Sequence, residues 1–354
     1  METADDTRRL EFACPVTLVV EEMAALLNAE ITDHPIYDGI ELQWFDDATH
    51  GTGMLAFLSR RDDRRVDYYV EPGLTLDRTG YEIGGGTGVW VEAAFGAARL
   101  EVGSEGVVAD VRFVDVDGRS IEVLVDDREA GPRRGGSLLA PVGSSVDRPA
   151  SLLLAFLHGF DLIRRGPDVP RIVIDGSDVR TGRLPFGVLH RRHLIKAAGP
   201  VTVARLCPTG VPARDDLEIE ETGDVVVAVR ARQGRSEAEV RLQPGFPHVQ
   251  SPDGSVEGAW TVSIDGMPIT GGEWSAIRHD DRIDVSLDVT RPWKPAAGQS
   301  PLMRIVTRVA PVFRRWPTTY RWDATIELGD AGSMIDGRWS RIGGDDSYRR
   351  LTRS

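Results

Sequence analysis

The segment Trp44-Phe-Asp-Asp-Ala-Thr-His50 brings together side chains that could transfer a proton. In an extended strand, Trp44 and Asp46 point to one face and the two residues that alternate with them point to the other. A carboxylate beside an indole in an apolar cavity has a raised pKa and can act as an acid. His50 follows four residues later and could relay the proton. Asp46 and His50 are therefore candidate catalytic residues, with a solvated turn as the alternative interpretation of this segment.

A second candidate lies in Asp67-Tyr-Tyr-Val-Glu71, where Tyr69 and Glu71 share one face of a predicted strand. If the interior of the fold is polar, Tyr69 and Glu71 line it and are candidate catalytic residues as well. If Tyr68 and Val70 instead form the core, the acidic row faces water.

Aromatic side chains are the candidate walls of a substrate pocket. Six of the eight tryptophans lie in the last third of the chain. Aromatic faces stabilise a developing carbocation, which suits hydration or cyclisation started by protonation. The candidate substrate-binding residues are Trp44, Trp90, Trp293, Trp316, Tyr320 and Trp322. The alternative is that these aromatic residues fill the hydrophobic core.

The sequence contains no motif for nucleotide, hydrolase or metalloprotease chemistry. Gly84-Gly-Gly-Thr-Gly88 matches neither the dinucleotide-binding nor the P-loop pattern. His190 and His193 have the i, i+3 spacing of two ligands on one helix face, but Arg191 and Arg192 beside them would repel a cation. We expect no metal site and no cofactor.

The charge balance bears on the partners of this 354-residue chain. It has 55 acidic and 42 basic residues, a net charge of −13. A surface that binds phosphates needs a basic balance, so we exclude nucleic acid as a main partner. Apart from Lys196 and Lys294 every basic residue is an arginine, and Asn28 is the only asparagine. A GC-rich genome is one explanation of this bias, and arginine-specific recognition is the other.

Cysteine usage and hydropathy bear on the compartment. Cys14 and Cys207 fit no metal or redox spacing, so we expect two buried free thiols, with a disulfide between them as the alternative. No apolar stretch of 18 residues occurs. We therefore expect a cytoplasmic protein that is not integral to a membrane, and the sequence leaves its oligomeric state open.

Hydrophobic periodicity predicts a mostly β chain. Residues 15–29 carry apolar side chains at helical spacing and predict an N-terminal helix, and the apolar run 151–160 predicts a second short helix. An amphipathic helix is predicted over 301–316, with a kink at Pro311. Alternating apolar residues predict strands at 41–45, 53–58, 66–70, 88–93, 99–102, 107–114, 120–125, 171–174, 201–206, 217–220, 225–232, 238–242, 260–264, 272–277, 283–289, 320–328 and 336–342.

Residues 207–216 have the composition of a linker and mark the boundary between two β domains. Together with an N-terminal segment, this gives three parts. We predict an N-terminal helical segment at 1–30, a first β-barrel-like domain at 31–206, and a second at 207–354 that carries the late helix. Residues 172–182 resemble residues 262–271, which indicates either internal duplication or two similar Asp-rich hairpins. Many short strands with Gly-rich turns favour barrels or sandwiches.

The acidic aromatic strand Glu41-Leu-Gln-Trp-Phe45, placed after a short helix and before two successive meanders, resembles the tandem lipocalin-like proteins. That group contains carotenoid hydratases of the hydroxyneurosporene synthase type and lipocalin-type cyclases, including Diels–Alderases. The early strand of the family has a Glu-Trp-Trp-Tyr pattern, whereas Leu42 and Gln43 replace two aromatics here, so no catalytic residue is carried over. The resemblance implies two lipocalin-like antiparallel barrels and a deep apolar cavity for polyene- or terpenoid-like compounds.

These observations predict a cofactor-independent lyase or isomerase, a hydratase or cyclase, that binds a hydrophobic small molecule near the domain junction. Asp46 or Glu71 would exchange a proton, assisted by His50 or Tyr69. The alternatives are a non-catalytic carrier of a lipid or pigment and a scaffold whose interior is filled. An apolar cavity with one or two carboxylates favours the enzyme, and a wholly apolar cavity favours the carrier.

Overall fold

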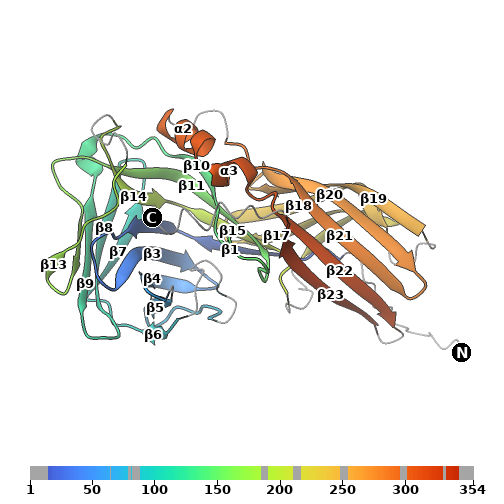
Figure 1. The fold of residues 1–354 in the computed structure, drawn as a ribbon, viewed down its shortest axis with the longest axis horizontal. Coiled ribbons are helices and arrows are strands. Elements are labelled where there is room, and N and C mark those ends of the chain that lie inside the picture. The colour runs from blue at the N-terminus through green and yellow to red at the C-terminus, as the bar shows by residue number, and fades with distance from the viewer. Residues whose placement is uncertain are drawn as a thin grey trace, which may run out of the picture.

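The computed structural model describes residues 15–63, 65–78, 81, 88–184, 190–209, 217–247, 254–295, 301–329 and 332–342. Strands make up most of these residues, and they pair into three sheets (Figure 1). Among the described residues, the strands pair antiparallel except for one short parallel pair at the edge of the largest sheet. The chain is therefore mostly β, as the sequence predicts.

The first half of the chain contains two sheets. The larger pairs in the order β1-β15-β11-β14-β2-β3-β4-β5-β6, with β10 also against β11. Its strands are β1 (Leu18–Met23), β2 (Ala25–Glu30), β3 (Tyr37–Asp47), β4 (Gly51–Arg60), β5 (Val66–Val70), β6 (Trp90–Glu92), β10 (Gly136–Ala140), β11 (Leu152–Arg164), β14 (Arg192–Ala198) and β15 (Val201–Leu206).

A five-stranded sheet covers one face of the larger sheet and pairs in the order β13-β12-β9-β8-β7. One hydrophobic cluster joins the two sheets, with Leu27 and Ile40 on one side and Val111 and Ile121 on the other. The sheet consists of β7 (Ala97–Val102), β8 (Val107–Val114), β9 (Ser120–Asp126), β12 (Arg171–Ile174) and β13 (Ser177–Asp178), with a 3-10 turn η1 (Arg128–Ala130) after β9.

The second half is an eight-stranded meander in which each strand pairs with the next. Its strands are β16 (Glu218–Thr222), β17 (Val225–Gln233), β18 (Ser236–Pro247), β19 (Gly254–Ile264), β20 (Met267–His279), β21 (Arg282–Arg291), β22 (Tyr320–Gly329) and β23 (Gly332–Arg341). The connection between β21 and β22 carries α2 (Pro301–Val309) and α3 (Pro311–Arg315). The predicted late helix is thus present, and Pro311 divides it because proline cannot donate an amide hydrogen inside a helix.

Two predicted helices are wrong. Residues 15–29 form β1 and β2, and residues 151–160 belong to β11. Both faces of these strands are buried, so their apolar residues run almost without interruption. Such a run fits a buried strand and a buried helix equally well. The segment 15–30 is therefore not a separate helical part: β1 pairs with β15, and β2 lies between β14 and β3.

Barrel-like domains and an internal duplication are two further expectations from the sequence. Among the described residues, no pairing joins the first and last strands of any sheet, so the architecture is that of antiparallel sheets. The similar segments 172–182 and 262–271 each contain an Asp-Gly turn with positive φ at both residues, Asp175-Gly176 and Asp265-Gly266. This two-residue hairpin turn demands that dipeptide and accounts for part of their likeness.

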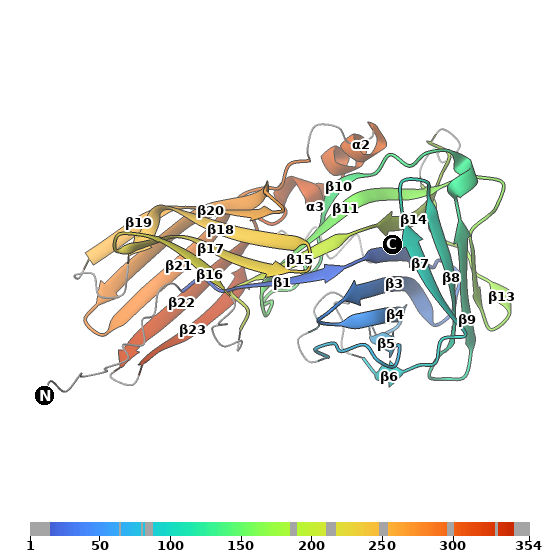
Figure 2. The same ribbon diagram turned by 180° about the vertical axis from the view of Figure 1, so that it is seen from behind.

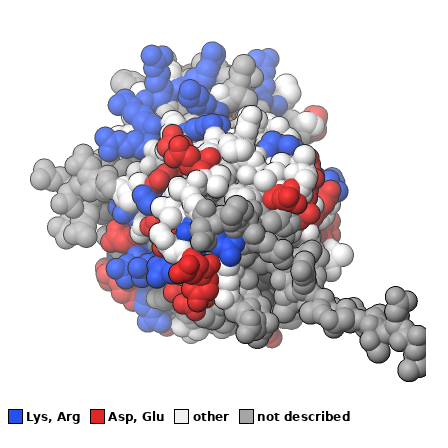
Figure 3. All heavy atoms as spheres, turned by 90° about the vertical axis from the view of Figure 1, so that its right-hand side faces the viewer, with Lys and Arg blue, Asp and Glu red and all other residues white. Residues whose placement is uncertain are grey.

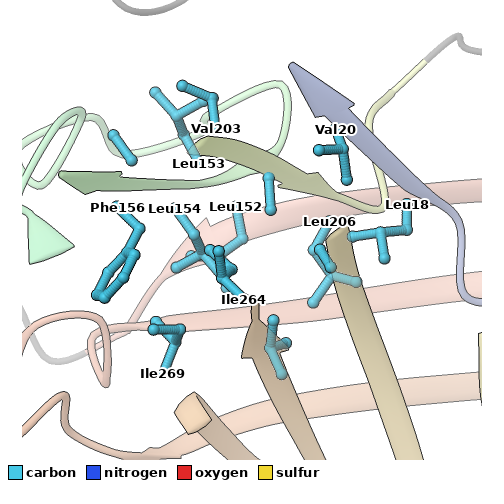
Figure 4. Close-up of a cluster of buried hydrophobic side chains, with 14 of the residues drawn as sticks. Leu18, Val20, Leu152, Leu153, Leu154, Phe156, Val203, Leu206, Ile264 and Ile269 are labelled. Carbon is cyan, nitrogen blue, oxygen red and sulfur yellow. The ribbon is translucent and has the colours of Figure 1, made fainter. Parts of the chain in front are cut away.

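The hydrophobic core continues from the first half into the second. Leu152, Leu154 and Phe156 of β11 lie with Leu206 of β15 in a cluster that reaches Ile264 and Ile269 of the eight-stranded sheet (Figure 4). Seen from behind, β1 and β15 run from the first half toward the eight-stranded sheet (Figure 2). The two halves therefore share an apolar interface.

Candidate functional site

A cavity of about 430 Å3 lies on the face of the large sheet that the five-stranded sheet leaves uncovered. That volume is in the range of about 300–1,000 Å3 that is typical of small-molecule pockets. Its walls are mostly aliphatic, with three polar side chains among them. The lining residues are Met23, Leu26, Asn28, Glu41, Leu138, Ala140, Pro141, Val142, Ala155, Leu157, Phe160, Leu162, Leu184, Leu194, Lys196, Val201, Val312 and Phe313.

The three polar residues of the cavity form a row across neighbouring strands. In the register of the sheet, Lys196 of β14 lies opposite Asn28 of β2, and Asn28 lies opposite Glu41 of β3. Residues directly opposite each other in antiparallel strands have Cβ atoms about 5 Å apart. Three side chains that are far apart in sequence therefore meet on one apolar wall.

A chain of hydrogen bonds runs through this row to the Glu41 carboxyl. Lys196 Nζ donates to Asn28 Oδ1 at 3.2 Å, and Asn28 Nδ2 donates to Glu41 Oε2 at 2.9 Å. From the other side, the Tyr81 hydroxyl donates to Gln43 Oε1, and Gln43 Nε2 donates to Glu41 Oε1 at 2.6 Å. Because each amide oxygen is occupied by the outer donor, each amide nitrogen faces Glu41. Both carboxyl oxygens thus accept a hydrogen bond from the protein.

Burial decides the ionisation of Glu41. It raises the pKa of Glu41 from the ordinary 4.5 to about 7, against the opposing effect of Gln43, Asn28 and the positive charge of Lys196. Removing a carboxylate from water disfavours its charged form. Glu41 is half-buried and lines the cavity. At neutral pH this carboxyl is therefore present in both forms, as a general acid or base requires.

The outer wall of the cavity comes from the second half of the chain. Val312 and Phe313 of α3 line it, opposite the strands of the large sheet. Figures 1 and 2 both show α3 close to β10 and β11. Trp293 N donates to Trp316 O at 3.0 Å, which ties the two ends of this connection together. The cavity is thus completed at the junction between the two halves.

The candidate acid Asp46 lies outside the cavity. It is exposed near the end of β3, where the Thr52 hydroxyl donates to Asp46 Oδ1 at 2.8 Å. The burial on which its predicted acidity rested is absent. His50 is buried in the following turn, where its Nδ1 lies 2.9 Å from Asp47 Oδ2 and 3.2 Å from Gln233 Nε2 of β17. His50 therefore contacts the second half of the chain and does not line the cavity.

Tyr69 and Glu71 are also placed elsewhere. Tyr69 is fully buried between the two sheets of the first half, with its ring 4.8 Å from that of Phe113. Burial raises the pKa of Tyr69 far above its usual range. Glu71 Oε2 accepts the backbone N–H of Met54 at 2.9 Å. Every residue of β5 is buried, so Asp67 and Tyr69 face neither water nor a polar lumen, whereas Glu71, just after β5, is half-buried.

The predicted aromatic pocket walls form core instead. Trp293, Trp316, Tyr320 and Trp322 are buried in the cluster that includes the interior of the eight-stranded sheet, and Trp44 packs against the core between the first two sheets. Trp90 stacks on Tyr68 at 4.3 Å and meets the edge of Tyr81 at 5.6 Å. Two of the six are linked to the cavity wall: Trp90 reaches Glu41 through Tyr81 and Gln43, and the Trp316 backbone N–H donates to Val312 O at 3.0 Å.

Glu41 is the functional candidate that sequence reasoning missed. In the sequence Glu41 is the first residue of an acidic aromatic strand, whereas the predicted acid Asp46 lies at the other end of that strand. Composition held a usable signal: the single asparagine and one of the two lysines both contact this site. Only the pairing of β14, β2 and β3 shows that these rare residues belong together.

A second hollow, of about 380 Å3, lies on the eight-stranded sheet. Its charged side chains pair with one another, Arg282 with Asp284 at 2.7 Å and Arg321 with Asp323 at 2.8 Å. These short pairs join neighbours on single strands and are mostly exposed, so they are weak evidence of a site. The apolar cavity with its buried carboxyl is the stronger candidate.

Further predictions concern the cysteines, the glycine-rich segment 84–88 and the histidine pair. Cys14 and residues 84–87 lie outside the described residues. Cys207 is a buried free thiol. His193 lies in β14, so the helical spacing imagined for His190 and His193 does not apply. In the described ranges, no group of His, Cys, Asp or Glu is arranged to hold a metal ion. No helix within those ranges is long and apolar enough to cross a membrane.

Comparisons of this chain with protein-family models, curated proteins and solved structures find no match. The resemblance to the tandem lipocalin-like proteins thus depends on the overall layout and on the strand that contains Glu41.

Proposed function

We propose that this protein is a cofactor-independent enzyme, a lyase or isomerase of the hydratase or cyclase type, acting on a hydrophobic small molecule. One observation carries the proposal: a single carboxyl, Glu41, with a pKa of about 7, lies in the wall of an otherwise largely apolar cavity. An apolar cavity with a few convergent polar groups and a perturbed pKa is the usual form of an active site.

Glu41 is the proton donor and acceptor of the proposed reaction. In its neutral form it gives a proton to a double bond or a hydroxyl oxygen of the bound molecule. When a hydroxyl is protonated, the C–O bond breaks, water leaves, and an allylic cation remains. The Glu41 carboxylate then removes a proton from a carbon next to the allylic cation, or, where the cation is delocalised along a polyene such as retinol, water takes the proton at the far end of the chain. Either loss completes an elimination, and the reverse sequence is a hydration. The donors from Asn28 and Gln43 stabilise the carboxylate that forms in between.

Lys196 defines the polar end of the proposed substrate. Its ammonium group lines the cavity and bonds to Asn28 Oδ1 and Glu30 Oε1, each at 3.2 Å. Aliphatic residues form most of the remaining wall. The chemistry of this lining suits a terpenoid- or polyene-like chain with one oxygen-bearing group, a substrate class that agrees with the tandem lipocalin-like resemblance.

All-trans-retinol serves as a test compound, because it is a fluorescent polyene alcohol that acid dehydrates to a product with a distinct absorbance spectrum. The wild-type protein should bind retinol and accelerate this dehydration. Glu41→Gln should bind it with similar affinity but dehydrate it about 10²–10⁴-fold more slowly. Glu71→Gln is the matched control, because that carboxyl accepts a backbone N–H outside the cavity. It should leave the rate unchanged.

The same experiment separates the enzyme from the carrier. Equal dehydration rates in wild type and Glu41→Gln, with retinol bound by both, would favour a carrier and reject the catalytic role of Glu41. A carboxyl titration followed by infrared difference spectroscopy adds a test without substrate. A band that titrates near pH 7 in wild type should be missing in Glu41→Gln.

A further inference from the structure

The exposed face of α2 combines aliphatic and basic side chains. Ile305 and Val309 are 60% and 62% exposed, and among the described large aliphatic residues only Val169 is more exposed. They are one helical turn apart and so lie on the same side of the helix. Arg304 and Arg308 adjoin them, are also exposed, and have the same spacing. Isolated aliphatic residues are common on protein surfaces, whereas a helical stripe beside arginines is characteristic of interfacial helices.

The arginines of this segment differ from most others in the protein. Elsewhere, most of the described arginines pair with carboxylates, as Arg282 does with Asp284 and Arg321 with Asp323. Within the described part of the chain, no ion pair joins Arg304, Arg308, Arg314 or Arg315 to an acidic residue. A protein with net charge −13 therefore carries four arginines on one helix pair that form no ion pair with any described carboxylate. Figure 3 shows Lys and Arg side chains gathered along the upper edge of the molecule, where Figure 1 places α2 and α3.

This basic segment also forms the outer wall of the apolar cavity. α3 supplies Val312 and Phe313 to the lining, and Arg314 Nε donates to Arg308 O at 3.0 Å, which links α3 to α2. The helix with exposed Ile305 and Val309 is thus joined to the helix that walls the apolar cavity.

We infer that α2 and α3 dock this protein on an anionic lipid surface. The aliphatic stripe enters the headgroup region while the arginines bind lipid phosphates, an arrangement in which the negative charge of the lipid complements the positive charge of the segment. The remaining surface, which is acidic overall, faces away from the bilayer. The proposed docking of α2 and α3 on lipid does not depend on the catalytic role of Glu41.

Flotation of the full-length protein with lipid vesicles tests the inference. Vesicles of phosphatidylcholine with 30% phosphatidylglycerol should bind the protein at low ionic strength, pure phosphatidylcholine should bind it at least about tenfold more weakly, and added salt should release it. Each basic side chain near an anionic bilayer strengthens binding about fivefold. The double variant Arg304→Gln/Arg308→Gln should therefore bind about 25-fold more weakly.

A charge-matched control removes two exposed arginines that pair with aspartates, Arg282→Gln/Arg321→Gln. It changes the net charge equally and should bind anionic vesicles within about twofold of wild type. Ile305→Ser/Val309→Ser keeps all charges and should weaken vesicle binding about tenfold or more, because it removes the apolar insertion. Circular dichroism and the Tm should show that each variant folds, because these side chains are solvent-exposed.

Three outcomes would overturn the inference. The first is absence of binding to anionic vesicles at low salt. The second is binding that the matched control weakens as much as the α2 variants do. The third is binding that Ile305→Ser/Val309→Ser leaves unchanged while soluble heparin competes fully, which would assign the arginines to a soluble polyanion instead of a lipid surface.

Discussion

The cavity beside β2 and β3 and the interior of the eight-stranded sheet are both apolar, but different side chains line them. Tryptophans fill the second interior: Trp260, Trp274, Trp322 and Trp339 are each at most 2% exposed. Among the described residues that line the cavity there is no tryptophan, and Phe160 and Phe313 are the only aromatic ones. Its opposing walls carry aliphatic side chains, and a space remains between them that larger indole side chains would have filled.

This difference shows that abundant aromatic residues indicate where an interior is filled, and that a cavity can lie where they are few. The tryptophans are accommodated by glycines on neighbouring strands. A Cβ at Gly337 would lie 2.6 Å from the Trp322 ring, and one at Gly258 would lie 2.6 Å from Trp274 Nε1. In the second half these tryptophan rings pack against glycines, which have no side chain, so little space remains for a ligand there.

The largest expected effect is on the free energy of unfolding, and it is seen by comparing one aromatic residue of the packed interior with one of the cavity wall. Trp274→Ala should lower the free energy of unfolding by about 3–5 kcal/mol, because it opens a cavity in a packed core. Phe313→Ala, at the half-buried wall of a cavity that already exists, should lower it by less than about 1 kcal/mol while changing the affinity for retinol. Urea unfolding and retinol fluorescence measure the two effects. Similar losses of stability would show that the two interiors are packed alike.

A smaller effect concerns pH and the one carboxyl that the cavity buries. Glu41 has a pKa of about 7 in the folded protein, above its ordinary 4.5, so the folded state holds this proton more tightly. Its contribution to stability is therefore full below about pH 4.5 and is lost as the pH rises through 7. Glu41→Gln removes this dependence. Relative to wild type, the variant should become more stable between pH 5 and pH 8, by at most about 3 kcal/mol.

The control for this prediction is Asp46→Asn, which removes a carboxyl of the same strand from an exposed position. Urea unfolding of the three proteins at pH 5 and pH 8 gives the comparison. A stability difference between Glu41→Gln and wild type that stays constant with pH would mean that water reaches Glu41 as freely as it reaches the surface.

The smallest expected effect tests the fit between glycine and tryptophan. Gly337→Ala places a methyl group against the Trp322 ring and should lower the free energy of unfolding by about 1–3 kcal/mol. Gly103→Ala is the matched control, because a Cβ there meets no atom within 4 Å. Thermal unfolding of both variants measures the difference. Equal Tm values would indicate that Trp322 moves aside freely and that the second interior is loosely packed.

Alternation of apolar and polar residues determined most of the strands. It predicts β5, β8, β12 and β15 with the bounds that the structure has, and Pro311 divides the late helix as expected. This information is local, because successive side chains of a strand point to opposite faces. Alternation fails in β1, β2 and β11, where both faces are buried and the strand has no polar side to reveal its period.

The candidate site was decided by the tertiary structure. The sequence supplied a rare asparagine, a rare lysine and an acidic residue in a strand, but positions 28, 41 and 196 are brought together only by strand pairing across long stretches of chain. The same pairing half-buries Glu41 in the cavity wall and leaves Asp46, five residues along the same strand, exposed to water. Sequence fixes which groups can ionise, whereas desolvation, which sets the pKa of Glu41, depends on which distant strands cover that group.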